Sequence, residues 1–274
     1  MSVYLRLDRL GKEFGRGREK SVAIQDVSLD VAQGEFVALI GHSGCGKSTV
    51  LNLVAGLQEP TTGQVLLDGN RVEGPGADRA MVFQNYSLLP WLTVFDNVYQ
   101  AVDAVFGNLM PRYRKHGVTE RYLRMVSLWD HRTKRPSQLS GGMRQRVSIA
   151  RAFAVQPRVL LLDEPFGALD ALTKGSLHEE LLHMWSSEAQ RRPQTVLMVT
   201  HDIDEAIYLS DRIVVMGNGP AARVAEVIGV PLERPRDKRE LMHDRTFLLI
   251  KERLLELLEE GFSKPTYQSE ASAA

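Results

Sequence analysis

The chain has 274 residues, enough for one large α/β domain or two small ones, and 43% of them are hydrophobic. Its 34 lysines and arginines balance 34 aspartates and glutamates, so it lacks the basic excess that is typical of nucleic-acid binders. A single cysteine, Cys45, excludes a disulfide framework within the chain. No apolar run approaches the roughly 20 residues that span a bilayer, and the N-terminus lacks the apolar segment of a signal peptide, so any membrane role is expected to come through a partner.

The hydrophobic pattern predicts strands and helices that alternate along the chain. Period-two alternation indicates half-buried antiparallel strands in the first part, and continuous apolar runs indicate strands that are buried on both faces. Strands are predicted at residues 3–7, 27–31, 37–40, 64–68, 159–162, 195–199 and 213–216. A helix is predicted at 47–55, ahead of Gly56 and Pro60, and a leucine-rich amphipathic helix at about 246–260. Strands that alternate with helices favour a mostly parallel sheet covered on both faces.

A glycine-rich loop follows the predicted strand 37–40 and matches the pattern G-x-x-x-x-G-K-[ST]. Its glycines let backbone N–H groups turn inward without Cβ clashes, and the next helix points its positive N-terminus at the bound phosphates. Lys47 is expected to reach the β- and γ-phosphates of ATP, and Ser48 to bind Mg²⁺. The candidate nucleotide-binding residues are Gly41, His42, Ser43, Gly44, Cys45, Gly46, Lys47, Ser48 and Thr49. A coincidental glycine-rich turn is the alternative, with a chance of about one in a hundred in a random chain of this length.

Two carboxylates follow the predicted strand 159–162, and a histidine follows a later strand. Because ligands gather at the carboxyl ends of parallel strands, Asp163 is expected to hold Mg²⁺, directly or through water. Glu164 is expected to orient and deprotonate the attacking water, and His201 to donate a hydrogen bond to the γ-phosphate. Taken alone, an Asp–Glu pair is as often a helix cap and a lone histidine is more often structural. The phosphate loop upstream favours the catalytic interpretation.

A second helix N-terminus with exposed glycines is predicted at Ser140. Ser140 is expected to act as the N-cap, and Gly141 and Gly142 to expose backbone N–H groups, which makes a second anion site. An ordinary serine-capped helix is the alternative, because one triphosphate does not obviously need two helix N-termini that are so far apart in the chain.

Together these segments resemble the nucleotide-binding subunits of ABC transporters. The phosphate loop, Gln84, the LSGG segment, the LLLLDEP strand, Ala168-Leu169-Asp170 and His201 occur in the family's order, over about residues 3–230. The resemblance implies an α/β P-loop NTPase, with a RecA-like parallel-sheet core, an N-terminal antiparallel β subdomain and an inserted helical subdomain. It also implies that the LSGG segment closes over ATP held by the other subunit of a head-to-tail dimer, which accounts for the second anion site.

The same resemblance implies roles for three further residues. Gln84 would bind Mg²⁺, sense the attacking water and couple to the membrane subunits, and Asp170 would communicate across the dimer. Phe14 lies where the family places an aromatic ring against adenine, although it is equally a hydrophobic residue at a strand end. Two positions depart from the family. Met143 stands where glutamine is usual and removes a side-chain polar contact, and Gly167 stands where serine is common and leaves no hydroxyl for a contact across the dimer.

The change of pattern along the chain predicts four parts. Residues 1–84 are expected to hold the β subdomain and the phosphate-loop part of the ATPase core, and 85–156 a helical subdomain with the LSGG segment. The remainder of the core is expected at 157–230, and a C-terminal amphipathic helix with a disordered tail at 231–274. The apolar run 85–92, which contains Trp91, either forms a groove for a short helix of a membrane subunit or belongs to the core of the helical subdomain.

Longer runs such as VFQNYSLLPWLTVFDNV and MVTHDIDEAIYLSDRIVVMGNGP are similar to the import branch for nitrate, bicarbonate, cyanate and sulfonate or taurine, and most similar to its nitrate and bicarbonate members. The resemblance implies a peripheral ATPase subunit at the cytoplasmic face of the inner membrane. Its implied partners are integral-membrane permease subunits, a second ATP-binding subunit (identical or a paralogue) and, indirectly, a solute-binding protein, with no nucleic acid. Nitrate/nitrite or bicarbonate is the expected solute, and sulfonate, taurine or cyanate is the alternative.

Two other classes of function compete with transport. Soluble ABC ATPases of DNA repair need a long coiled-coil insertion, which is missing here, and ribosome-associated ones carry two ATPase domains, whereas this chain fits one. A nucleotide-binding regulator without activity would need neither Glu164 nor His201. Exporter subunits often fuse a membrane domain, for which this sequence has no span.

Overall fold

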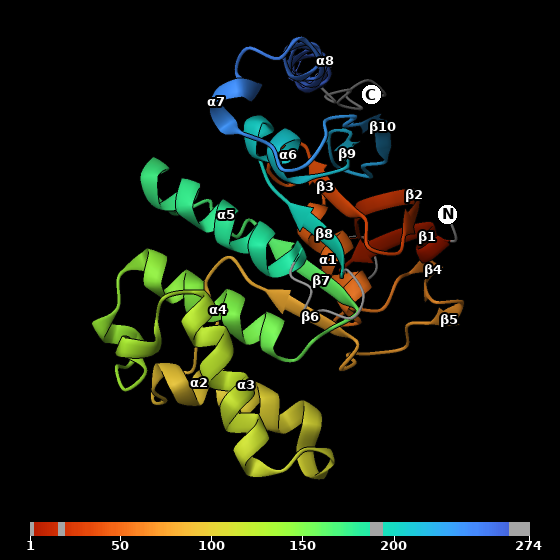
Figure 1. The fold of residues 1–274 in the computed structure, drawn as a ribbon. Helices are drawn as coiled ribbons and strands as arrows, with labels where there is room; N and C mark the ends of the chain where they lie inside the picture. The colour runs from red at the N-terminus through yellow and green to blue at the C-terminus, as the bar shows by residue number, and fades with distance from the viewer. Residues whose placement is uncertain (1–2, 16–19, 187–193, 263–274) are drawn as a thin grey trace, which may run out of the picture.

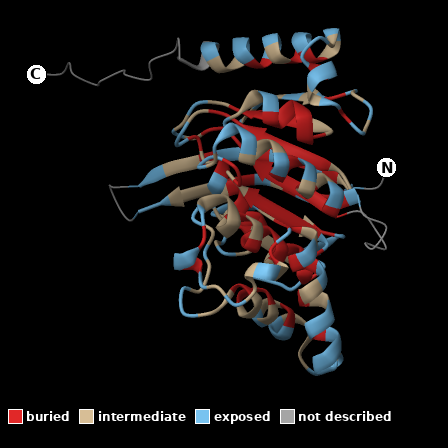
Figure 2. Ribbon diagram, turned by 60° about the vertical axis from the view of Figure 1, so that its left-hand side comes forward, coloured by how far each residue is buried: buried red, intermediate tan, exposed pale blue. Residues whose placement is uncertain are grey.

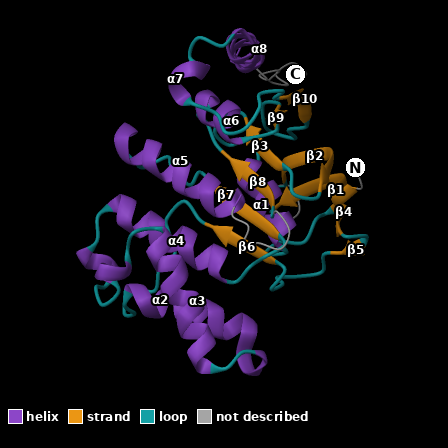
Figure 3. Cartoon of the chain, viewed as in Figure 1, coloured by secondary structure: helices purple, strands orange, loops and turns teal. Residues whose placement is uncertain are grey.

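Two β-sheets and the helices around them form the part of the chain that the structure describes. The computed structural model describes residues 3–15, 20–186 and 194–262. Figure 1 shows a sheet near the N-terminus, a central sheet beside it, and a group of helices, α2 to α4, at the far end of the molecule. In Figure 3, which colours helices and strands differently, this group contains helices and loops, and the strands lie in the rest of the molecule. The predicted α/β fold, with an N-terminal antiparallel part and an inserted helical part, is confirmed.

The N-terminal sheet is antiparallel and has the strand order β2-β1-β4-β5. Its strands are β1 (Val3–Phe14), β2 (Ser21–Ala32), β4 (Thr62–Leu67) and β5 (Asn70–Arg71). In β2, Val27, Leu29 and Val31 are buried and alternate with the exposed Ser28 and Asp30, as period-two alternation requires of a sheet with one covered face. The predicted strands 3–7 and 27–31 are therefore real, although each belongs to a longer strand.

The central sheet has the strand order β10-β9-β3-β8-β7-β6. Its strands are β3 (Phe36–Ile40), β6 (Arg79–Val82), β7 (Val159–Asp163), β8 (Thr195–Val199), β9 (Arg212–Met216) and β10 (Val224–Gly229). All neighbours are parallel except β10, which pairs antiparallel with β9. Because β3, β6, β7 and β8 run in one direction, the residues that follow them meet at one edge of the sheet.

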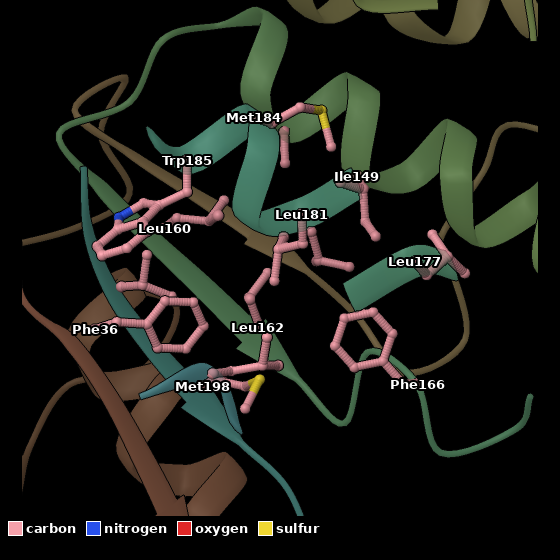
Figure 4. Close-up of a cluster of buried hydrophobic side chains, with 14 of the residues drawn as sticks. Phe36, Ile149, Leu160, Leu162, Phe166, Leu177, Leu181, Met184, Trp185 and Met198 are labelled. Carbon is pink, nitrogen blue, oxygen red and sulfur yellow. The ribbon is translucent and has the colours of Figure 1, made fainter. Parts of the chain in front are cut away.

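Helices cover both faces of the central sheet and give the molecule two hydrophobic cores. The helices are α1 (Lys47–Ala55), α2 (Val94–Phe106), α3 (Arg112–Met125), α4 (Gly141–Ala154), α5 (Ala171–Ser186), α6 (Ile203–Leu209), α7 (Lys238–Leu241) and α8 (Arg245–Phe262). One core holds Phe36, Leu162 and Met198 against α4 and α5 (Figure 4). The other lies between the sheet, α1 and the N-terminal sheet. Figure 2 shows the buried residues concentrated in these layers.

The helical part starts later than the sequence pattern predicts. Helicity was expected from about residue 85, but the first helix begins at Val94, with the Thr93 side chain as its cap. The buried side chain of Asn97 explains the difference, because it binds the non-helical chain before it. Its Oδ1 accepts from the backbone N of Leu89 at 2.8 Å, and its Nδ2 donates to the Leu89 carbonyl at 3.2 Å. Loop 85–93 is therefore held in an irregular conformation by a residue of α2.

Trp91 lies at the surface, and the helix predicted near the C-terminus is present. Trp91 is 66% exposed, so the interpretation that it packs inside the helical part is wrong. The amphipathic helix expected at 246–260 is α8, which extends the prediction slightly at both ends. The tail expected at 263–274 lies outside the described residues. Within the described ranges, none of the helices combines the length and apolarity that crossing a bilayer requires.

Candidate active site

The loop between β3 and α1 has glycine at the positions where its backbone would strain any other residue. Gly44 and Gly46 have φ values of 81° and 90°, in the left-handed region. A Cβ atom at Gly46 would overlap the Ile24 side chain, and one at Gly41 would lie 2.9 Å from the Met216 carbonyl oxygen. The loop is therefore packed tightly against strands on one side and ends at the N-terminus of α1, a local geometry suited to phosphate.

Lys47 closes this loop on itself. Its ammonium group is buried and donates to the carbonyl oxygens of Gly41 and His42, each at 2.8 Å. The neighbouring Ser48 hydroxyl donates to Oδ1 of Asp163 at 2.9 Å. That contact joins the first turn of α1 to the end of β7, so two of the three residues that were predicted to hold Mg²⁺, Ser48 and Asp163, are adjacent in the structure.

Asp163 and Glu164 sit at the end of β7 in different environments. Burial raises the pKa of Asp163, and the hydrogen bond from Ser48 and the charge of Lys47 partly oppose that rise. Glu164 has a φ of 44°, which is unusual for a residue other than glycine. Its backbone N donates to the Val199 carbonyl at 3.0 Å, and its carbonyl accepts from Gly167 N at 3.2 Å. These bonds hold a strained backbone at the place where the predicted base lies.

Gln84 and His201 meet at the Glu164 carboxylate. The Gln84 amide donates from Nε2 to Glu164 Oε2 at 3.1 Å, and Nδ1 of His201 lies 3.5 Å from the same oxygen. These residues follow β6, β7 and β8, so the parallel sheet brings together three side chains that are far apart in the sequence. Gly167 lies beside them, where a Cβ would be 3.5 Å from the His201 ring and 3.6 Å from Glu164 Oε2. The group has the composition of a site that positions and deprotonates a water molecule.

The LSGG segment lies on a different element from this cluster. Ser140 caps α4 as predicted, because its hydroxyl accepts from Met143 N at 3.2 Å. The nearest atoms to a Cβ at Gly141 and Gly142 would belong to Tyr86 and Thr173, and none to the phosphate loop. The structure therefore leaves this second helix N-terminus apart from the first within one chain.

Asp170 and Phe14 lie at the periphery. The Asp170 carboxylate accepts from Thr173 N at 3.0 Å, and the hydrogen bonds from Thr173 lower its pKa. Phe14 ends β1 with 42% of its surface exposed, and the Lys12 ammonium lies 5.3 Å from its ring centroid. Both assignments stay predictions.

Sequence pattern did not predict the contacts of two basic residues near the site. Arg151 of α4 donates to the carbonyls of Ser87 and Tyr86, at 2.6 and 3.0 Å, in the segment that follows Gln84. Lys174 of α5 donates to the Asp202 carboxylate at 2.9 Å, immediately after His201. The partners lie 64, 65 and 28 residues away in the chain, so no local motif marks these cations.

Known proteins that resemble this chain are ABC transporter ATP-binding proteins and transport proteins. A family model described as ABC transporter matches residues 24–167. The chain is 51% identical over 260 residues to the nitrate import ATP-binding protein NrtD of Synechococcus elongatus, covering 95% of this chain and 93% of the relative. It is 48% identical over 262 residues to the bicarbonate transport ATP-binding protein CmpD of a Synechocystis species, covering 96% and 91%. It is 47% identical over 260 residues to the nitrate transport protein NasD of Klebsiella oxytoca, covering 95% and 98%.

Solved structures match as well. Two dimeric structures of the bacterial ABC transporter cassette MJ0796, one of them bound to ADP and Pi, superpose with a TM-score of 0.74 and 32% sequence identity. Each match covers 84% of this chain and 100% of the cassette.

Proposed function

This chain belongs to the ABC transporter family and is a transport-coupled ATPase, and on that premise we propose that it drives import of a small planar anion, nitrate or bicarbonate. The support is the agreement of relatives that are named for nitrate import, nitrate transport or bicarbonate transport and that match nearly the whole chain. Both anions are flat oxyanions with one negative charge, so a single class of solute accounts for both kinds of relative.

The observation that supports the chemistry best is the cluster at the carboxyl edge of the central sheet. The glycine loop and the Lys47 ammonium fit a triphosphate, and the adjacent Ser48 and Asp163 oxygens fit Mg²⁺, which prefers hard oxygen ligands. When bound, Mg²⁺ would neutralise charge on the β- and γ-phosphate oxygens. Lys47 would exchange its bonds to the loop carbonyls for bonds to phosphate oxygens, which are stronger because both partners are charged.

Glu164 is the proposed general base. Its carboxylate would accept a proton from the attacking water, while Gln84, already bonded to the same carboxylate, would fix the direction of that water. His201 is near enough to Glu164 to act on the same reacting group and is proposed to donate a hydrogen bond to the γ-phosphate. The left-handed backbone of Glu164 supports this role, because strain of this kind gathers at functional positions.

A second copy of the chain or a paralogue is the proposed partner in hydrolysis. The LSGG helix N-terminus packs beside Tyr86 and Thr173 instead of the phosphate loop of its own chain, which leaves it available to another subunit's nucleotide. The solved relatives are described as dimeric. Permease subunits at the cytoplasmic face of the membrane, served by a solute-binding protein, are the further proposed partners, and the exposed Trp91 indole is the proposed contact.

Uptake measurements in a strain that lacks this chain test the proposal. Loss of labelled nitrate or bicarbonate uptake, restored by the wild-type chain and not by Glu164→Gln, is the expected result. Sulfonate, taurine and cyanate uptake provide the control, because these solutes belong to other members of the same branch. If one of them were lost while nitrate and bicarbonate uptake continued, the proposed solute class would be wrong although the ATPase assignment would stand.

A further inference from the structure

The side chain of His42 connects the phosphate loop to the other end of the chain. Its Nε2 lies 2.8 Å from the carbonyl oxygen of Leu258 in helix α8, 216 residues away. A carbonyl oxygen only accepts hydrogen bonds, so Nε2 is the donor. The backbone carbonyl of His42 meanwhile accepts from Lys47. His42 is thus held by the loop through its backbone and by α8 through its ring.

Helix α8 is a fixed support for this contact. Its apolar face buries Phe247, Ile250 and Leu254 in the core that also contains β3 and α6. Arg253 forms an ion pair with Glu226 of β10 at 2.6 Å. Figure 1 shows α8 beside α6 and the β9–β10 end of the sheet. The Leu258 carbonyl therefore has a defined position relative to the sheet from which the phosphate loop emerges.

The same helix also contacts the segment that carries His201. Lys251 pairs with Asp204 at 2.7 Å, and Asp204 is in the first turn of α6, three residues after His201. The C-terminal segment therefore contacts the phosphate loop through Leu258 and, through Lys251, the helix that follows His201. A helix that served only to cover the core would need neither contact.

We propose that α8 is a strap that positions the phosphate loop, and that His42 is the positioning residue through which it acts. A glycine-rich loop has many accessible backbone conformations, and ATP binding must pay for ordering them. A side chain that fixes the loop to a rigid helix before ATP arrives reduces that penalty. The proposal rests on the ATPase function above and concerns ATP affinity, because His42 touches the loop and not the water-activating cluster.

The first test measures ATP affinity of the purified full chain by equilibrium binding. His42→Ala is expected to weaken binding about fivefold, the effect of losing one hydrogen bond of about 1 kcal/mol. His42→Gln keeps an N–H donor and is expected to recover part of the affinity. His183→Ala replaces an exposed histidine of α5 and serves as the matched control, with affinity unchanged.

The second test asks whether His42 acts through Leu258. A chain that ends at Leu255 lacks the Leu258 carbonyl but keeps the three buried residues of α8. Its affinity is expected to fall as in His42→Ala, and combining both changes is expected to add nothing further. A chain that ends at Phe262 keeps the contact and is expected to bind like the full chain.

Several outcomes would overturn the proposal. Additive losses would show that His42 acts on the nucleotide without α8, and tighter binding in either variant would make α8 a brake instead of a support. If the shortened chain does not fold, as judged by circular dichroism and thermal melting, the His42 variants decide alone, and unchanged affinity in His42→Ala refutes the strap. Failure of the unaltered chain to bind ATP would instead refute the function on which the proposal rests.

Discussion

Replacing Arg151 by methionine tests how α4, the helix that follows Ser140, controls the segment that follows Gln84. The Arg151 guanidinium donates to the carbonyls of Tyr86 and Ser87, whose φ values of 64° and 44° are unfavourable for side-chain-bearing residues. Hydrogen bonds from a charged donor contribute roughly 1.5–3 kcal/mol each, and the lower value suits a partly exposed arginine. Losing both therefore removes about 3 kcal/mol of support, while two left-handed residues still cost about 1–2 kcal/mol each.

Local opening of residues 85–92 is expected to become about a hundredfold more frequent in Arg151→Met, since each 1.4 kcal/mol is a factor of ten. Hydrogen exchange measured by mass spectrometry reports this directly. The amide of Tyr86 is bonded to the Phe83 carbonyl and the amide of Leu89 to the Asn97 side chain, so both are slow to exchange while the segment is closed. Hydrolysis is expected to fall together with this protection, because Gln84 immediately precedes the segment.

Two variants control the experiment. Arg151→Lys keeps the charge but lacks the planar fork that reaches two carbonyls, so an intermediate exchange rate is expected. Arg158→Met removes an arginine whose side chain is 65% exposed, and exchange in the segment should not change. Unchanged protection of Tyr86 and Leu89 in Arg151→Met, with α4 still folded, would refute the reasoning.

Three shorter predictions concern the site and its surface. Glu164→Gln should keep ATP binding but slow phosphate release by about 10²-fold or more, the usual effect of a general base, and near-normal turnover would remove Glu164 from that role. Gly167→Ser should fold with a stability change within about 0.5 kcal/mol by thermal melting, because a Cβ there meets only ordinary contacts; a severe loss would mean that the space beside His201 does not accept a side chain. Trp91→Glu should retain the ATPase activity of the purified chain but fail to copurify with the permease subunits, since the indole is 66% exposed; normal assembly and uptake would place the coupling surface elsewhere.

Local sequence pattern is sufficient to predict the buried strands and the phosphate loop of this protein. The apolar runs at 37–40, 159–162 and 195–199 are buried parallel strands because only a strand covered on both faces is apolar without alternation. The phosphate loop can also be predicted from local sequence, because its glycines adopt positive φ values that a few consecutive residues require. Knowing that carboxyl ends of parallel strands share an edge was then enough to place Asp163, Glu164 and His201 at the same edge of the central sheet.

The tertiary structure decided what depends on distant partners. Loop 85–93 is irregular because Asn97 binds its backbone, and Trp91 is exposed because that loop holds it away from the core, although its composition fits a buried segment equally well. Arg151 and His42 acquire their roles only from carbonyl oxygens 64 and 216 residues away. A backbone carbonyl is present at every residue and leaves no mark in the sequence, so only the folded chain shows which of them a side chain will reach.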